Sequence, residues 1–138
     1  MKYLGIDYGT KRIGLATAPS GSRMAFPLRV IPFTPTLVGD IARICSDEGV
    51  GAIVMGNSLN FQNQPNAIMK KILPFVEELK IATGLPVEFM NEVLSSQEAM
   101  HLQGDNSEND ASAATIVLQS YLDKILPKRE EDDEDDEE

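Results

Sequence analysis

The stretch MKYLGIDYGTKRIGLATA, residues 1–18, contains two apolar runs separated by a short polar turn. The turn Gly9-Thr10-Lys11 has the residue types that favour a tight connection between antiparallel strands. A third run of strand-forming residues follows a second turn that is rich in Pro, Ser and Gly. We therefore predict an antiparallel meander of three strands, at 2–8, 12–18 and 24–31.

Beyond this meander, helical and extended patterns alternate along the chain. Apolar residues recur at helical spacing in several segments, and two short apolar runs have the length and composition of buried strands. Pro74 lies inside one helical pattern, so we expect that helix to kink there or to divide in two. The predicted elements are a helix at 36–47, a strand at 52–56, a helix at 65–83, a strand at 87–90, and helices at 95–102 and 108–126.

This order, β-β-β-α-β-α-β-α-α, predicts an α/β fold. Hairpins followed by alternating strands and helices are typical of a mixed sheet, here of about five strands, with helices packed on its faces. The chain has 138 residues, of which 42% are hydrophobic and 25% are charged, which suffices for one domain with one core. We predict that residues 1–127 form this single domain.

The acidic C-terminus dominates the net charge. The formal net charge is −10, but the last nine residues, EEDDEDDEE, are all acidic. Without them 13 acidic residues remain against 12 basic ones, so the folded part is near neutral and its charge neither supports nor excludes nucleic-acid binding. We predict that residues 128–138 form a disordered tail, either a solubilising appendage or an autoinhibitory mimic of nucleic acid.

The cysteine and histidine content narrows the possible chemistry. Because the chain has one cysteine, Cys45, and one histidine, His101, a zinc site built from such residues is excluded. Cys45 belongs to the apolar stripe of a predicted helix, which indicates a buried, inert thiol. The sequence has no signal-peptide pattern and no apolar run near the ~20 residues that span a bilayer. We expect a soluble, cytoplasmic protein without a membrane partner.

Three acidic residues stand at positions where an acidic side chain is unusual. Asp7 ends a strand that should be buried, Glu92 follows the strand at 87–90, and Asp110 lies in the apolar stripe of the last helix. Each has an ordinary explanation as well: a turn-forming Asp, a solvated loop Glu, and an Asp that interacts with a helix dipole. Together, the three can converge at one rim of the sheet.

A converging cluster of carboxylates has a distinct chemistry. It either raises its pKa values or binds a cation, because like charges without a counter-charge repel one another. Mg²⁺ binds carboxylates together with water and phosphate oxygens, and two such ions about 3.5–4 Å apart are the usual means of hydrolysing a phosphodiester. Lys11 and Arg12 follow Asp7 closely, where they serve either as phosphate contacts or only as a surface hairpin pair.

The segment IDYGTKRIG, residues 6–14, resembles the opening of the YqgF family, also called RuvX. The resemblance continues through FPL (26–28), AIVMG (52–56), NEVLSSQEA (91–99) and NDASAATIVLQSYL (109–122), and so covers nearly all of the chain except the acidic tail. It implies an RNase H-like fold related to RuvC-type Holliday junction resolvases. It also implies a hydrolase that acts on ester bonds, a metal-dependent nuclease that processes the 5′ end of pre-16S rRNA during ribosome biogenesis.

The resemblance carries over to particular residues. It implies that Asp7, Glu92 and Asp110 are both the catalytic residues and the ligands of one or two Mg²⁺ or Mn²⁺ ions. It also implies that Lys11 and Arg12, with Gly9 and Thr10 of the same turn, contact the substrate. RNA is the partner that the resemblance favours, and structured DNA is the alternative.

Among the departures from the family pattern, which include Asn57-Ser58 in place of Leu-Pro and Asn109 in place of Ile, two fall in the block that contains Glu92. Asn91 stands where the family block usually has Asp, and Val93 stands where it usually has Arg. These departures favour an alternative in which the fold is kept as an RNA- or protein-binding module with weakened catalysis. A Holliday-junction nuclease is a further alternative. The GIDYGT turn also resembles the phosphate-binding hairpin of actin-like ATPases and sugar kinases, although those proteins need a much longer chain.

Overall fold

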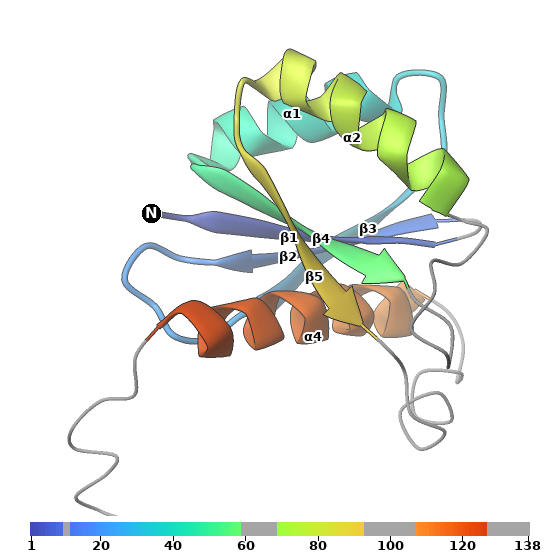
Figure 1. Cartoon of the computed structure of the whole chain (residues 1–138). Helices are drawn as coiled ribbons and strands as arrows, with labels where there is room; N and C mark the ends of the chain where they lie inside the picture. The colour runs from blue at the N-terminus through green and yellow to red at the C-terminus, as the bar shows by residue number, and fades with distance from the viewer. Residues whose placement is uncertain (10–11, 59–68, 93–106, 127–138) are drawn as a thin grey trace, which may run out of the picture.

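The computed structural model describes residues 1–9, 12–58, 69–92 and 107–126. Figure 1 shows their arrangement, a central sheet with helices on both sides. The strands are β1 (Tyr3–Tyr8), β2 (Arg12–Ala18), β3 (Phe26–Pro32), β4 (Ala52–Ser58) and β5 (Val87–Glu92), and the helices are α1 (Leu37–Glu48), α2 (Met69–Thr83) and α4 (Ser107–Ile125).

The five strands form one mixed sheet in the order β3-β2-β1-β4-β5. The first three strands are antiparallel neighbours, whereas β4 pairs in parallel with β1, and β5 pairs in parallel with β4. The predicted meander and the predicted mixed sheet of about five strands are therefore confirmed. Strand β1 lies at the centre of the sheet, so its last residues are flanked by a neighbouring strand on each side.

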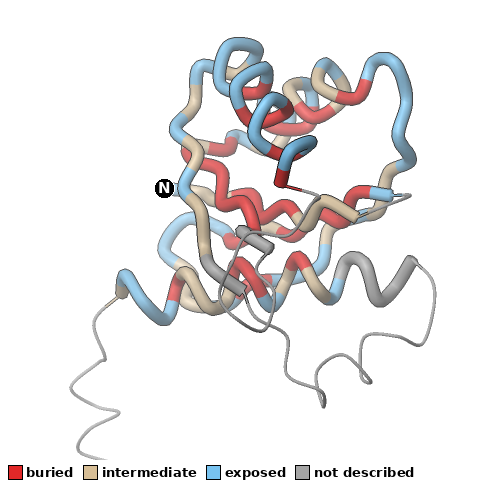
Figure 2. Tube along the Cα trace, turned by 45° about the vertical axis from the view of Figure 1, so that its right-hand side comes forward, coloured by how far each residue is buried: buried red, intermediate tan, exposed pale blue. Residues whose placement is uncertain are grey.

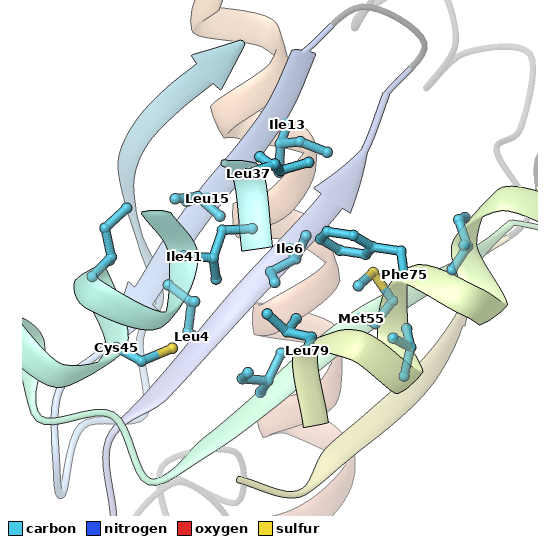
Figure 3. Close-up of a cluster of buried hydrophobic side chains, with 14 of the residues drawn as sticks. Leu4, Ile6, Ile13, Leu15, Leu37, Ile41, Cys45, Met55, Phe75 and Leu79 are labelled. Atoms are coloured by element: carbon cyan, nitrogen blue, oxygen red, sulfur yellow. The ribbon is translucent and has the colours of Figure 1, made fainter. Parts of the chain in front are cut away.

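Helices cover both faces of the sheet and define two apolar layers. In Figure 1, α1 and α2 lie above the sheet and α4 lies below it. Figure 2 shows the buried stretches concentrated in the strands and on the inner sides of the helices. We call the two sides of the sheet the α1/α2 face and the α4 face. The layer on the α1/α2 face is shown in Figure 3, with labelled side chains Leu4, Ile6, Ile13, Leu15, Leu37, Ile41, Cys45, Met55, Phe75 and Leu79.

The alternation of side chains along β1 sends its residues to opposite faces. Leu4 and Ile6 are fully buried in the layer against α1 and α2, and Tyr8 packs against the same layer. Tyr3 packs against the cluster on the α4 face. By the same alternation, Gly5 and Asp7 belong to the α4 face.

Gly5 allows α4 to approach β1 closely. A Cβ atom at position 5 would lie 2.8 Å from Leu118 Cβ and 3.1 Å from the Ala114 backbone oxygen, closer than such atoms can pack. The close approach brings buried residues of α4 directly onto the sheet, among them Ala114, Val117, Leu118 and Leu122. A glycine in β1 therefore sets the distance between the central strand and the last helix.

Several boundaries differ from the sequence expectations. Helix α2 runs through Pro74 as one helix, so the division into two helices is wrong. Pro74 and Lys70 are exposed, which lets water bind the Lys70 carbonyl that loses its backbone donor. Strand β5 reaches Glu92 rather than ending at residue 90. The predicted helix at 95–102 and the tail at 128–138 lie outside the described residues.

Cys45 has the environment that its sequence context predicts. Its side chain is buried in the layer against α1 and α2. Burial raises the pKa of the Cys45 thiol from 9.0 to about 11, because the thiolate would lose its hydration. A thiol in this state is neutral at physiological pH, which agrees with the expected structural role.

Candidate active site

The candidate site lies at the end of the sheet where β1, β4 and β5 finish. Because these three strands are parallel to one another, their C-terminal ends lie at the same side of the sheet (Figure 1). Asp7 is the last-but-one residue of β1 and is half-buried on the α4 face. The structure thus places the first of the predicted carboxylates at the rim that the sequence indicates.

The register of α4 on β1 places Asp110 at the level of Asp7. The rings of Tyr3 and Tyr121 lie 5.6 Å apart, and the Gly5 position contacts Leu118 and Ala114. Later residues of β1 therefore lie beside earlier residues of α4. Two strand residues span about 6.6 Å and one helical turn spans about 5.4 Å, so the next step pairs Asp7 with the turn before Ala114. Asp110 lies in that turn.

Glu92 lies two strands away from Asp7 at the same end of the sheet. Its Cα partner is Ser58 of β4, and β4 separates β5 from β1. Met90 packs against the cluster on the α4 face, so position 92 belongs to that face by alternation. Strands lie about 4.8 Å apart and Glu92 is two residues, about 6.6 Å, beyond the level of Asp7, so the two Cα atoms are separated by roughly 12 Å. All three predicted carboxylate positions therefore share one face and one end.

Two glycines flank Asp7 on this face. Asp7 pairs with Gly14 of β2, and the parallel register of β1 on β4 brings Gly56 to its other side. Gly56 is in turn paired with Met90 of β5. Both glycines are buried and add no side chain of their own beside Asp7. This arrangement could not be recognised in the sequence, because it becomes visible only through the pairing of the strands.

The turn after Asp7 is closed by its own backbone. The Gly9 amide donates a hydrogen bond of 2.9 Å to the Arg12 carbonyl, and a Cβ at position 9 would lie only 2.5 Å from that oxygen. Gly9 is thus required for the tight turn itself. Arg12 is exposed at the start of β2, next to the site. Thr10 and Lys11, the other two predicted substrate contacts, lie outside the described residues.

The chain neighbours of Asp7 and Glu92, residues 8 and 91, belong to the α1/α2 face instead. Tyr8 points away from Asp7, and its ring packs against Phe33 and Phe75 at centroid distances of 5.2 and 5.1 Å. Burial raises the pKa of the Tyr8 hydroxyl above its usual value. Asn91 belongs to this face as well, because it alternates with Met90 and follows Phe89 by two residues.

Oxygen donors at the three carboxylate positions fit a hard divalent cation. Mg²⁺ and Mn²⁺ bind a few carboxylates and complete their shells with water or phosphate oxygens. Among the side chains that the structure describes, no group of three His, Cys, Asp or Glu residues lies close enough to hold a metal ion. The side chains of Glu92 and Asp110 are not among the described ones. The prediction that they form a metal site with Asp7 therefore rests on the backbone positions of the three residues.

The comparisons with known proteins agree with this architecture. The model of the family described as "RuvX: Holliday junction resolvase" matches residues 1–124. The chain belongs to the RuvX family. The family resemblance read from the sequence is thereby confirmed, and with it the expectation of a hydrolase of the nuclease class.

Curated relatives of the RuvX chain carry the name "Putative pre-16S rRNA nuclease". One from Nitratidesulfovibrio vulgaris is 40% identical over 132 residues, covering 88% of this chain and 93% of the relative. One from an Anaeromyxobacter species is 40% identical over 134 residues, covering 89% and 97%. One from Lawsonia intracellularis is 36% identical over 139 residues, covering 94% and 98%.

Solved structures confirm the RNase H-like fold of this RuvX chain. Thermus thermophilus RuvC in complex with a Holliday junction substrate superposes with a TM-score of 0.56 at 17% identity, covering 88% of this chain and 93% of RuvC. Fowlpox virus resolvase in complex with Holliday junction DNA also has a TM-score of 0.56, at 13% identity and with 92% and 100% coverage. At these identities the likeness concerns the fold. Within the described residues, no helix is long and apolar enough to cross a membrane.

Proposed function

We propose that this protein is a metal-dependent nuclease that hydrolyses phosphodiester bonds in pre-16S rRNA, with Asp7, Glu92 and Asp110 as its catalytic carboxylates. The proposal is supported by the backbone positions of these residues: Asp7 near the end of β1, Glu92 at the end of β5, and Asp110 near the start of α4, which packs against β1. The names of the curated relatives support the RNA substrate. The proposal includes residues 1–127 as one catalytic domain.

The three carboxylates would hold one or two Mg²⁺ or Mn²⁺ ions at this end of the sheet. The bound ions would supply a nucleophilic water and neutralise the charge that develops on the phosphate. Asp7 is the residue best placed to orient the scissile phosphate, because it lies near the end of the central strand of the sheet, between β2 and β4. Arg12 and Lys11 of the same turn would bind the negatively charged phosphates that flank the scissile phosphate.

The position of Asn91 favours catalysis over a binding module without chemistry. Asn91 stands where the family usually has Asp, which suggested a weakened site. In this structure, however, position 91 belongs to the α1/α2 face, whereas Asp7 and position 92 belong to the α4 face. The exchange of Asp for Asn therefore leaves the proposed ligand set complete. Val93, the other departure, lies outside the described residues.

A panel of substrates tests the proposed function. We expect cleavage of a transcript that contains the 5′ region of pre-16S rRNA in Mg²⁺ or Mn²⁺, and no cleavage in excess EDTA, because the carboxylates alone supply no counter-charge for the phosphate. Four-way DNA junctions and unrelated structured RNA serve as competitors for specificity. Preferential cutting of the DNA junction would identify a resolvase instead, and cleavage that persists in EDTA would refute the metal-dependent mechanism.

A further inference from the structure

An aromatic row crosses the α1/α2 face beside the candidate site. The Tyr8 ring lies in the middle and makes edge contacts with Phe75 of α2 and with Phe33, which follows β3. Phe75 is buried, with 7% of its surface exposed, whereas 37% of Phe33 is exposed. The row thus begins in the core and ends as an accessible phenyl ring at the end of the sheet.

Phe33 lies at the same end of the sheet as Asp7. It directly follows Pro32, whose Cα partner is Arg12, and Tyr8 is the chain neighbour of Asp7. The centroids of the Phe33 and Tyr8 rings lie 5.2 Å apart, so packing against Tyr8 restricts the movement of the Phe33 ring. A large aromatic side chain that is both exposed and supported offers a fixed flat surface at a nuclease site.

Cationic side chains accompany this ring. Arg12 is exposed next to Pro32, and Lys70 and Lys71 are exposed in the first turn of α2, which begins at the same end of the sheet (Figure 1). Lys71 precedes Phe75 by four residues and therefore lies one turn nearer the rim on the same side of the helix.

The two lysines stand where helices usually avoid cations. A helix N-terminus carries partial positive charge, and α1 follows the rule with Asp40 in its first turn. Helix α2 has no acidic residue in its first turn. Among the described residues, Lys70 and Lys71 form no ion pair, whereas Lys80 of the same helix lies 3.6 Å from the Glu77 carboxylate. Within the described part of the chain, no ion pair thus offsets these two positive charges, which lie on the other side of the sheet from the α4 face.

We propose that Phe33, Arg12, Lys70 and Lys71 form a surface that binds the single-stranded RNA adjoining the scissile phosphate, with a base stacked on Phe33 and phosphates on the cations. Proteins bind single strands by this combination of aromatic platforms and positive charge. A duplex keeps its bases stacked on each other, so the exposed ring selects an unpaired segment. This inference rests on the proposed nuclease function and names the form of RNA that the site accepts.

Binding by Phe33 variants tests the aromatic part of the surface. All proteins carry Asp7→Asn so that the RNA stays intact, and affinity is measured by anisotropy with a short single-stranded oligoribonucleotide and with a blunt-ended RNA duplex. We expect Phe33→Ala to weaken binding of the single strand about 5- to 150-fold and to leave binding of the duplex unchanged. Phe26→Ala is the matched control, because Phe26 is 45% exposed at the other end of β3.

A tryptophan at position 33 provides a direct readout of stacking. The chain contains no tryptophan, so Phe33→Trp introduces a single indole that keeps an aromatic ring at this position. We expect its fluorescence to be quenched when the single strand binds, and that of Phe26→Trp to be unaffected. Equal quenching at the two positions, equal affinities of the two alanine variants, or an equal loss for duplex and single strand would each overturn the proposal.

The lysine pair is tested through the salt dependence of binding. Each phosphate contact on a single strand contributes about 0.7 to the slope of log K against log salt concentration, so Lys70→Ala/Lys71→Ala should make the slope about 1.4 less steep. Lys80→Ala is the control on the same helix, and we expect it to leave the slope unchanged. An unchanged slope for the double variant would overturn this part. Failure of the unmodified protein to cleave RNA would instead count against the nuclease function, since binding at Phe33 does not require cleavage.

Discussion

Asp7→Asn should lower the rate of RNA cleavage by about a thousandfold. A carboxylate that holds a catalytic ion contributes several kcal/mol to the stabilisation of the transition state, and each ~1.4 kcal/mol is a factor of ten in rate. Asn keeps the size and one oxygen of Asp but removes its negative charge. The rate is measured under single-turnover conditions with saturating enzyme and saturating Mg²⁺, so that changes in the affinity for RNA or metal do not enter.

Glu88→Gln is the matched control for this variant. Glu88 lies on β5 and pairs with Val54, four residues before Glu92, so it is an acidic residue of the same strand at the opposite end. We expect its cleavage rate to stay within a factor of two of the unmodified protein. The melting temperature of each variant, measured in EDTA, checks that the fold is intact. Comparable losses for Asp7→Asn and Glu88→Gln would show that Asp7 has no special role.

Gly5→Val should strongly destabilise the protein, although Gly5 is not one of the proposed site residues. A single Cβ at this position already lies 2.8 Å from Leu118 Cβ and 3.1 Å from a backbone oxygen of α4. Overpacking of this kind costs about 1–3 kcal/mol for one added group, and valine adds two further methyl groups. We therefore expect the free energy of unfolding to fall by about 3 kcal/mol or more, measured by urea denaturation.

Gly5→Ala separates stability from the geometry of the site. We expect it to remain folded but to push α4 away from β1, which displaces the turn that contains Asp110 from Asp7 and lowers the cleavage rate. Gly39→Ala is the control, because a Cβ at that helical position meets nothing within 4 Å. Replacing a glycine inside a helix by alanine should stabilise α1 by up to about 1 kcal/mol. A fully active Gly5→Ala variant would show that the spacing of α4 does not control the site.

Much of the fold was predictable because its signals are local. The three-stranded meander could be read from apolar runs and turn residues, and the cores of α1 and α2 from helical periodicity. The exposed ends were harder to predict. Ile125 continues the apolar stripe of α4 in sequence yet is 38% exposed, because the helix ends just after it at the edge of its layer.

The candidate site was only partly predictable, because it is assembled by pairing between distant segments. Asp7, Glu92 and Asp110 could be singled out from their unusual positions, and their role as a joint metal site stays a prediction. The glycines that flank Asp7 could not be recognised, since residues 14 and 56 become its neighbours only through the register of β2 and β4.

The face to which Asn91 belongs was equally invisible in the sequence. It depends on the exact phase of β5, and a shift of one residue would have moved Asn91 to the α4 face, to which Asp7 belongs. Met90 packs in the apolar layer on the α4 face and Phe89 in the layer on the α1/α2 face, and these contacts fix the phase of β5. The departure from the family pattern at this position therefore has less bearing on the ligand set than the sequence alone suggested.

The central claim is that Asp7, Glu92 and Asp110 bind divalent metal at one site, and a crystal soaked in Mn²⁺ tests it most directly. Anomalous scattering locates manganese independently of any assumption about its ligands. We predict an anomalous peak, or a pair of peaks, between the C-terminal end of β1 and the first turn of α4, with oxygen atoms of all three carboxylates around it. Manganese bound elsewhere, or a peak at this end that lacks Asp7 among its ligands, would contradict the account.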